Sequence, residues 1–278
     1  MKKLLKSRLF TFILGLIIAG GIGVYATSQI LASDISYRNG TVESALNDLY
    51  DKANNASGIK LCKYISGTEM TVGAKYECTL GDKDENDNYI KRNFYILSTS
   101  SNNTVDMIMD RNITESTENK KIVWSNAINY FNSGQPGYKY TTAWTNVVSI
   151  SLPSSVSIAR AVNNNSWNVN DNWFCFGLKD KSSCIAGSYT YSTPEEIAAA
   201  QNYRWLFNYT ADCTAFGCDS NTNLDSSEAS GYWCKDNWQN SSNAMSVDRH
   251  GRLNDTTINN QNFGIRPSIT VLKSSLYK

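Results

Sequence analysis

The sequence predicts an α+β fold in which strands near both ends of one domain pair in a single sheet around helices and loops. Two β-rich runs within residues 89–113 flank the polar turn "SSNN" and predict an early hairpin. A capping box formed by Thr193 and Glu196 predicts a helix start. Apolar residues alternate over 265–271, so we expect a closing strand there.

The N-terminus predicts export. Basic residues precede an uncharged apolar run at 9–26, whose length fits either a signal-peptide core or a spanning helix. Small residues suit cleavage near Ala26 and, more weakly, near Ala32. We assign residues 1–33 to a signal peptide or an N-terminal membrane anchor, with the remainder outside the cytoplasm.

Charge and composition bear on the partner. The formal net charge is +1, and no Lys/Arg block follows the first eight residues, so no nucleic-acid partner is expected. Asn, Ser, Thr and Tyr are abundant, which suits a polar extracellular surface that binds without much charge. An AT-rich genome would also enrich Asn.

The cysteines fit an oxidising compartment. Pairing of near neighbours would form three disulfides, Cys62–Cys78, Cys175–Cys184 and Cys213–Cys218, and would leave Cys234 unpaired. Other pairings stay open on sequence grounds. No CxxC pair occurs and His250 is the only histidine, so we expect no metal and no cofactor.

Two segments precede the main predicted domain. At 34–57, Thr41 can cap a short amphipathic helix with an apolar stripe over 42–49. This stalk is too short to be stable alone, so it should pack on the domain or self-associate with a second copy. Residues 58–87 are expected to form a small β element held by Cys62–Cys78.

The acidic stretch 81–88 has the alternation of a calcium loop. However, Asp87 stands where the turn glycine is needed, and Asn93 stands where a bidentate Glu is needed. We interpret it as a solvated hairpin tip.

Three helical segments are expected in the main domain, 88–278. Trp124, Ala127, Ile128 and Phe131 share one helical face, and a Gly/Pro break at 133–137 ends that helix. A second helix is predicted over 142–150, and the third starts at Thr193. Alternation of Met245 and Val247 into a turn at Gly251 then predicts a late hairpin.

The order of these elements, with "GYWCKDNW", "AMSVDRHGRL" and "FGIRPSITVL", resembles the C-type lectin-like fold of exported bacterial domains. Retroelement-diversified variable proteins and formylglycine-generating enzymes share that general fold. The resemblance covers residues 88–278 and implies that both ends meet in one sheet, while long loops form a display surface. One of Trp233 and Trp238 should be core, and Arg266 should donate hydrogen bonds to loop carbonyls.

The leading functional hypothesis is a non-catalytic, adhesin- or receptor-like binding protein at the cell surface or secreted. Amides and aromatic rings suit a protein or glycan ligand. The sugar-binding triplets of calcium-dependent lectins are absent, so binding should not require calcium. The predicted ligand-binding residues are Trp238, Gln239, Asn240, Asn243, Asn254, Asp255 and Asn259.

Two alternative functions fit parts of the sequence. A minor pilin or pseudopilin shares the plan of apolar helix, stalk and β head, but no Asp or Glu precedes Asp34. A formylglycine-generating oxidase would use a pair such as Cys213 and Cys218, but the flanking residues do not match that family. For Ser–His–Asp chemistry only His250 is available, in a predicted turn. We therefore expect no enzyme activity.

Overall fold

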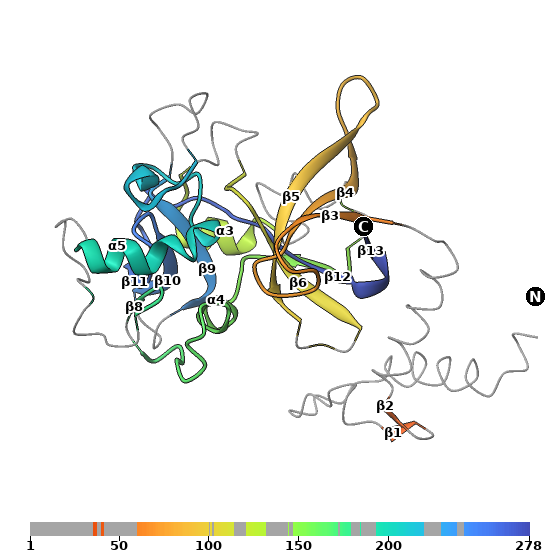
Figure 1. Ribbon diagram of the computed structural model, residues 1–278. Helices are drawn as coiled ribbons and strands as arrows, with labels where there is room; N and C mark the ends of the chain where they lie inside the picture. The colour runs from red at the N-terminus through yellow and green to blue at the C-terminus, as the bar shows by residue number, and fades with distance from the viewer. Residues whose placement is uncertain are drawn as a thin grey trace, which may run out of the picture. The chain divides into compact units, whose positions relative to one another are not determined.

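The computed structural model describes residues 36–37, 40–41, 60–99, 101, 103–113, 121–131, 144, 147–171, 173–178, 184, 193–219, 229–237 and 242–278 (Figure 1). The chain divides into two units, Met1–Ala53 and Asn54–Lys278. In the first, strands β1 (Ser36–Tyr37) and β2 (Gly40–Thr41) pair antiparallel. The predicted apolar span at 9–26 and the stalk stripe at 42–49 lie outside the described residues. Among the residues described, no helix has the length and hydropathy needed to cross a membrane.

The second unit has mixed α+β structure dominated by two sheets. The larger sheet has the strand order β13-β3-β4-β5-β6-β12-β7. Its strands are β3 (Cys62–Ser66), β4 (Lys75–Lys83), β5 (Tyr89–Ser98), β6 (Thr104–Met109), β7 (Ser149–Ser151), β12 (Ser268–Leu272) and β13 (Leu276–Tyr277).

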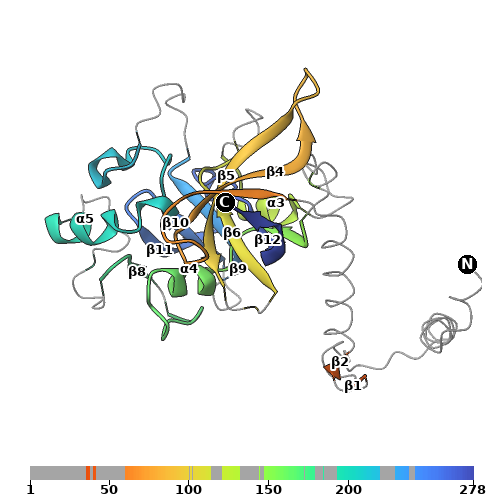
Figure 2. The ribbon, with the colours of Figure 1, turned by 45° about the vertical axis from the view of Figure 1, so that its right-hand side comes forward.

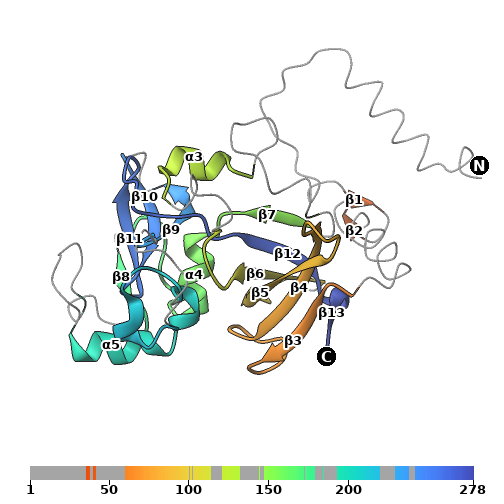
Figure 3. The ribbon, with the colours of Figure 1, turned by 90° about the horizontal axis from the view of Figure 1, so that it is seen from above.

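Both predicted ends of the domain meet in this sheet. The early hairpin β5–β6 forms as expected, and the closing strand β12 pairs antiparallel with β6. Figure 3 shows β12 lying between β6 and β7. Pro267 comes just before β12, where its missing N–H costs no ladder bond. The final strand β13 runs parallel to β3, so the prediction that the ends pair is confirmed.

The β element predicted at 58–87 is not separate from the main domain in the structure. Strand β4 pairs with β5 along most of its length, so the boundary placed between 87 and 88 falls in the turn of one hairpin. The reason is burial. Tyr76 and Leu80 of β4 enter the same apolar cluster as Phe94 and Ile96 of β5, and neither strand could cover those side chains alone.

The tip of the β4–β5 hairpin projects from the unit, as Figures 1 and 2 show. Its turn is built on Asp84, whose Oδ1 accepts hydrogen bonds from the backbone N–H groups of Asn86 and Asn88, each at 2.9 Å. Both amides are exposed. The prediction of a solvated hairpin tip rather than a calcium loop agrees with this geometry.

The smaller sheet has the order β8-β11-β10-β9. Its strands are β8 (Phe174–Cys175), β9 (Gly231–Asn237), β10 (Asn243–Asp248) and β11 (Arg252–Thr257). The late hairpin predicted around Gly251 is β10–β11 and is confirmed. Gly231 starts β9 where a Cβ would lie 2.0 Å from the carbonyl oxygen of Val247, so no larger residue fits.

Helices flank the sheets. They are α3 (Trp124–Asn129), α4 (Ser155–Ala161), α5 (Pro194–Gln201) and the 3-10 turns η4 (Arg204–Leu206), η5 (Cys213–Phe216) and η6 (Lys273–Ser275). The capping box of α5 is present: Glu196 N donates to Thr193 Oγ1, and Thr193 N donates to Glu196 Oε2. The helix α3 ends two residues before Phe131, which is still buried beside it.

The helix predicted over 142–150 is wrong. The described residues of that stretch are not helical, and from Ser149 they enter β7. Val148 donates its backbone N–H to Thr270 of β12, so pairing with the closing strand replaces the helical bonds. The helix α4 instead begins at Ser155, five residues after this stretch ends.

The two faces of the larger sheet cover different cores. Phe94, Ile96 and Met107 point into one cluster, whereas Leu97 and Ile108 point into the other. The second cluster also contains Met245 and Val247 of the smaller sheet, together with residues of α4 and α5. Alternation along each strand thus places one face against the rest of the unit.

Disulfides join the three near-neighbour cysteine pairs. The Cα atoms of Cys62 and Cys78 lie 4.0 Å apart across β3 and β4, and those of the other two pairs lie 5.6 Å apart. Cys234 is free and fully buried. The predicted pairings and the odd cysteine therefore agree with the structure.

Candidate functional site

The predicted ligand-binding residues do not converge where the structure describes them. Trp238, Gln239 and Asn240 lie outside the described residues. Asn243 Nδ2 donates to Asp255 Oδ2 at 2.9 Å, so these two side chains bridge β10 and β11 to each other.

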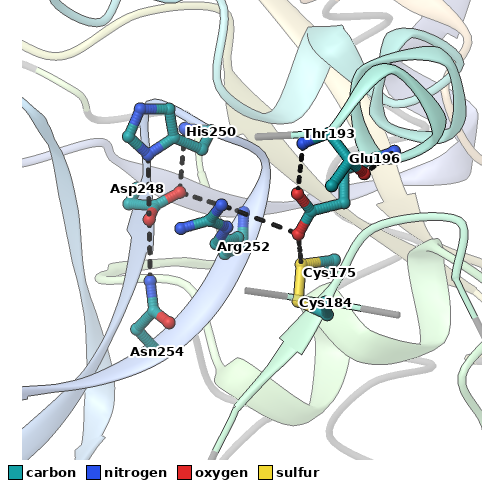
Figure 4. Close-up of a disulfide and its surroundings, with 8 residues drawn as sticks. All are labelled: Cys175, Cys184, Thr193, Glu196, Asp248, His250, Arg252 and Asn254. Carbon is teal, nitrogen blue, oxygen red and sulfur yellow. Dashed lines mark hydrogen bonds and ion pairs between the residues drawn. A yellow bond between two sulfur atoms is a disulfide. The ribbon is translucent and has the colours of Figure 1, made fainter. Parts of the chain in front are cut away.

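Asn254 stabilises the turn of the β10–β11 hairpin (Figure 4). Its Nδ2 donates to Asp248 Oδ2 at 2.8 Å, while Asp248 Oδ1 accepts from the backbone N–H groups of His250 and Arg252. Asn254 and Asp255 are consecutive on β11 and so point to opposite faces of the sheet. Asn259 is exposed in the turn after β11. The four described residues therefore form no common site.

The Cys175–Cys184 disulfide lies beside a buried carboxylate (Figure 4). Glu196 Oε1 is 3.2 Å from Cys175 Sγ and 3.6 Å from Arg252 Nη2. The ligand atoms of both cysteines and Glu196 lie within 4.8 Å of one another, a spacing that a metal could use. The two sulfurs are bonded to each other, and Glu196 both caps α5 and pairs with Arg252. We therefore interpret this network as a structural link between α5, the disulfide and β11, and not as a metal site.

A different group of side chains has the character of a ligand site. It lies where the start of β4, the middle of β5 and the two residues after β6 meet the segment that follows α5. We call it the aromatic–cation cluster, and its members are Lys75, Tyr95, Asp110, Arg111, Trp205 and Tyr209.

Two aromatic rings form one half of the cluster. The centroids of Tyr95 and Trp205 are 5.4 Å apart with planes tilted by 37°. Lys75 is paired with Tyr95 across β4 and β5, and its Nζ lies 5.6 Å from the Tyr95 centroid. The Trp205 indole lies against Gly73, where an added Cβ would be 3.5 Å from Nε1. Both rings are half-buried, so part of each remains open to solvent.

A carboxylate organises the charged half. Arg111 donates from Nε to Asp110 Oδ1 at 2.9 Å and from Nη2 to Oδ2 at 3.2 Å. Lys75 Nζ is 4.0 Å from the same Oδ2. The Asp110 side chain is only 2% exposed, so it is a fixed anchor for two cations. The hydrogen bond to Asp110 raises the pKa of Arg111, which keeps that guanidinium charged.

Tyr209 is held in a costly backbone conformation. Its φ of +58° is in the left-handed region, which an aromatic L-residue rarely adopts. The ring receives Arg111, whose Cζ is 4.2 Å from the ring centroid, and its hydroxyl donates to Asp219 Oδ2 at 3.2 Å. Reciprocal hydrogen bonds between Asn208 and Asp219 hold the same segment. Strain of this kind gathers where a protein positions a functional side chain.

Several donors of the cluster are unengaged. The Tyr95 hydroxyl, the Trp205 indole N–H and the Arg111 Nη1 group make no hydrogen bond with any residue that the structure describes. Half-buried rings with adjacent free donors can stack on a flat apolar face and bind acceptor oxygens. The cluster is therefore suited to holding a ligand.

Tyr95 offers a pH test of this geometry. Burial, and then the charge of Asp110, raise the pKa of Tyr95 to about 12. A tyrosine pKa near 10 in the unfolded chain means that Tyr95 contributes its full stability below about pH 10 and loses it as pH rises toward 12. We expect Tyr95→Phe to lose less unfolding free energy than the wild type between pH 9 and pH 11.5, as measured by urea denaturation. The exposed Tyr89→Phe is the control, and equal pH dependence in all three proteins would contradict the expectation.

Sequence reasoning missed this cluster because no local motif contains it. Its members come from residues 75–111 and 205–209. The pairing of β4 with β5 brings Lys75 to Tyr95, and tertiary contacts bring Trp205 to Tyr95 and Tyr209 to Arg111. The one available signal was Tyr95, an aromatic residue on the same strand face as the buried Leu97.

Comparison with known proteins does not identify the chain. No family model matches it, and neither a curated protein nor a solved structure matches it.

Proposed function

We propose that this chain is an exported, non-catalytic binding protein that contacts a protein or glycan ligand. It would act as an adhesin- or receptor-like molecule, held at the outer face of the plasma membrane by the N-terminal run or released after cleavage. The aromatic–cation cluster is the observation that carries the proposal. Its half-buried rings and unengaged donors can contact a ligand, and one member, Tyr209, is held at a positive φ.

The architecture supports the further proposal of a C-type lectin-like fold. That resemblance implies termini that meet in one sheet, and β12 and β13 pair with β6 and β3. It also implies a core tryptophan and a structural arginine, and both Trp233 and Arg266 are fully buried. The short strand with its Gly turn corresponds to the β10–β11 hairpin.

The disulfides and the N-terminus support export. Three cysteine pairs are joined, and the remaining thiol is shielded by burial, as expected for a protein of an oxidising compartment. The loop residues Trp238, Gln239 and Asn240 stay predicted contacts, separate from the cluster.

An array experiment tests the proposal. The full-length chain, purified in mild detergent, is applied to glycan and protein arrays with and without a chelator. We expect saturable binding that the chelator does not change. Trp205→Ala should weaken it about 30-fold, because a stacking ring at a binding site contributes about 2 kcal/mol.

Tyr89→Ala is the matched control, since that aromatic ring is 57% exposed at the hairpin tip, outside the cluster. Near-ultraviolet circular dichroism verifies that each variant is folded. Binding that survives Trp205→Ala and is lost in Trp238→Ala would move the site to the C-terminal loop. Absence of binding to every arrayed ligand would refute the proposed function.

A further inference from the structure

We propose that the aromatic–cation cluster selects acidic saccharides. In this proposal a sugar ring stacks on Tyr95 and Trp205, while its carboxylate is held by Lys75 and Arg111. The inference rests on the proposed binding function and names the ligand class that the same site would take.

The charges favour an anionic group. Lys75 and Arg111 approach the same oxygen of Asp110, so one carboxylate serves two cations. Lys75 stays 4.0 Å away, beyond hydrogen-bond distance, and its side chain is 23% exposed. Arg111 uses Nε and Nη2 on Asp110, while Nη1 makes no hydrogen bond within the described part of the chain. A ligand carboxylate could therefore join both cations without displacing Asp110.

The surrounding groups leave this positive excess in place. Asp219 accepts a hydrogen bond from the Tyr209 hydroxyl, its other hydrogen bonds are with Asn208, and its negative charge acts on both Tyr95 and Arg111. Arg266 is buried beneath the site and acts on Tyr95 as a further positive charge. The site and its surroundings thus hold three cations, Lys75, Arg111 and Arg266, and two carboxylates, Asp110 and Asp219.

The rings favour a saccharide as the bearer of that carboxylate. A pyranose ring offers a flat C–H face for Tyr95 and Trp205 and hydroxyl oxygens for their unengaged O–H and N–H donors. An acidic peptide would satisfy the cations, but it brings no rigid flat face to a ring pair tilted by 37°. The combination of stacking and charge matches a sugar acid.

The test compares acidic with neutral saccharides on the full-length chain in detergent. The probes are tetragalacturonate, a sialylated trisaccharide and neutral galactotetraose, measured by calorimetry at 50 mM and 300 mM NaCl. We expect at least one acidic probe to bind tenfold or more tightly than galactotetraose, with affinity falling at the higher salt concentration. The two acidic arms distinguish a hexuronic from a nonulosonic acid.

Matched variants assign the effect to the cluster. Lys75→Gln should weaken acidic binding about tenfold, whereas Lys91→Gln should leave it unchanged, because Lys91 pairs with Glu77 and is 65% exposed. Asp219→Asn keeps an oxygen acceptor for Asn208 and removes a negative charge, so it should tighten acidic binding about threefold. Misfolding could not produce that gain.

The outcomes separate the two proposals. Equal binding of neutral and acidic probes that is lost in Trp205→Ala would overturn acid selection and leave the binding function standing. Acidic binding unaffected by Lys75→Gln and Asp219→Asn would overturn this site as its location. If no saccharide binds while a protein ligand does so through Trp205, the saccharide class is wrong; if nothing binds at all, the proposed function itself fails.

Discussion

Replacement of Arg266 by methionine is expected to lower the free energy of unfolding by about 3–5 kcal/mol. Arg266 has no exposed surface, and its two terminal nitrogens donate to the carbonyl oxygens of Leu206 at 2.7 Å and Asn208 at 2.5 Å. Its Cζ lies 4.5 Å from the Tyr232 ring centroid. Methionine fills similar space but leaves two buried carbonyls without a donor.

The same replacement should weaken ligand binding. Arg266 fastens the segment that ends at Asn208, and the next residue is the strained Tyr209. Without the guanidinium fork, that strain is free to relax and to carry Tyr209 away from Arg111. Burial lowers the pKa of Arg266, but an arginine still remains charged at neutral pH. The lost interaction is therefore a charged one.

Urea denaturation measures the stability effect, with Arg160→Met on the exposed surface of α4 as the control. Arg266→Lys should fall between wild type and Arg266→Met, because an ammonium cannot span both carbonyls as a rigid fork. A loss in Arg266→Met no larger than in Arg160→Met would show that the fork does not hold the segment.

Trp233→Ala should cost about 3–5 kcal/mol as well, chiefly through lost packing. The side chain is fully buried, and its ring centroid lies 5.0 Å from that of Phe263. Its Nε1 donates to the carbonyl oxygen of Ile122 at 2.7 Å. The indole thus joins β9 to the segment before α3 and to the segment before β12.

A second substitution separates packing from hydrogen bonding. Trp233→Phe keeps most of the aromatic packing but removes the N–H that donates to the Ile122 carbonyl oxygen. We therefore expect a smaller loss of unfolding free energy, about 1–2 kcal/mol. Trp205→Ala, on the half-buried cluster, is the comparison and should cost less than Trp233→Ala. The order of the three losses in thermal or urea unfolding checks the expectation. A Trp205 loss exceeding the Trp233 loss would contradict it.

Local sequence patterns predicted those elements whose signals lie within a few residues. The capping box of α5, the hairpins β5–β6 and β10–β11, and the alternation of the closing strand were predicted and are present. Helix 142–150 was predicted wrongly, because Ser149 and Ile150 pair with β12 and long-range pairing overrides a local helical pattern.

The ligand-binding residues predicted at 238–259 do not form one site. Sequence reasoning looked for polar and aromatic residues close together in the chain, and it chose the amides around 238–259. Asn254 and Asp255 are adjacent there, yet alternation on β11 points them to opposite faces and gives each its own acidic or amide partner. Residues that are adjacent on a strand thus point their side chains to opposite faces, so they do not form one site as adjacent loop residues can.

By itself, the sequence predicted the α+β class and the meeting of the two ends in one sheet, and it suggested the near-neighbour disulfides without excluding other pairings. These follow from periodicity, spacing and residue chemistry, which act over short stretches of chain. Only the tertiary structure decided that residues 58–87 belong to the main sheet and that Lys75, Tyr95 and Arg111 meet Trp205 and Tyr209. Those contacts depend on strand register and on a segment more than ninety residues away, and no local pattern encodes that distance.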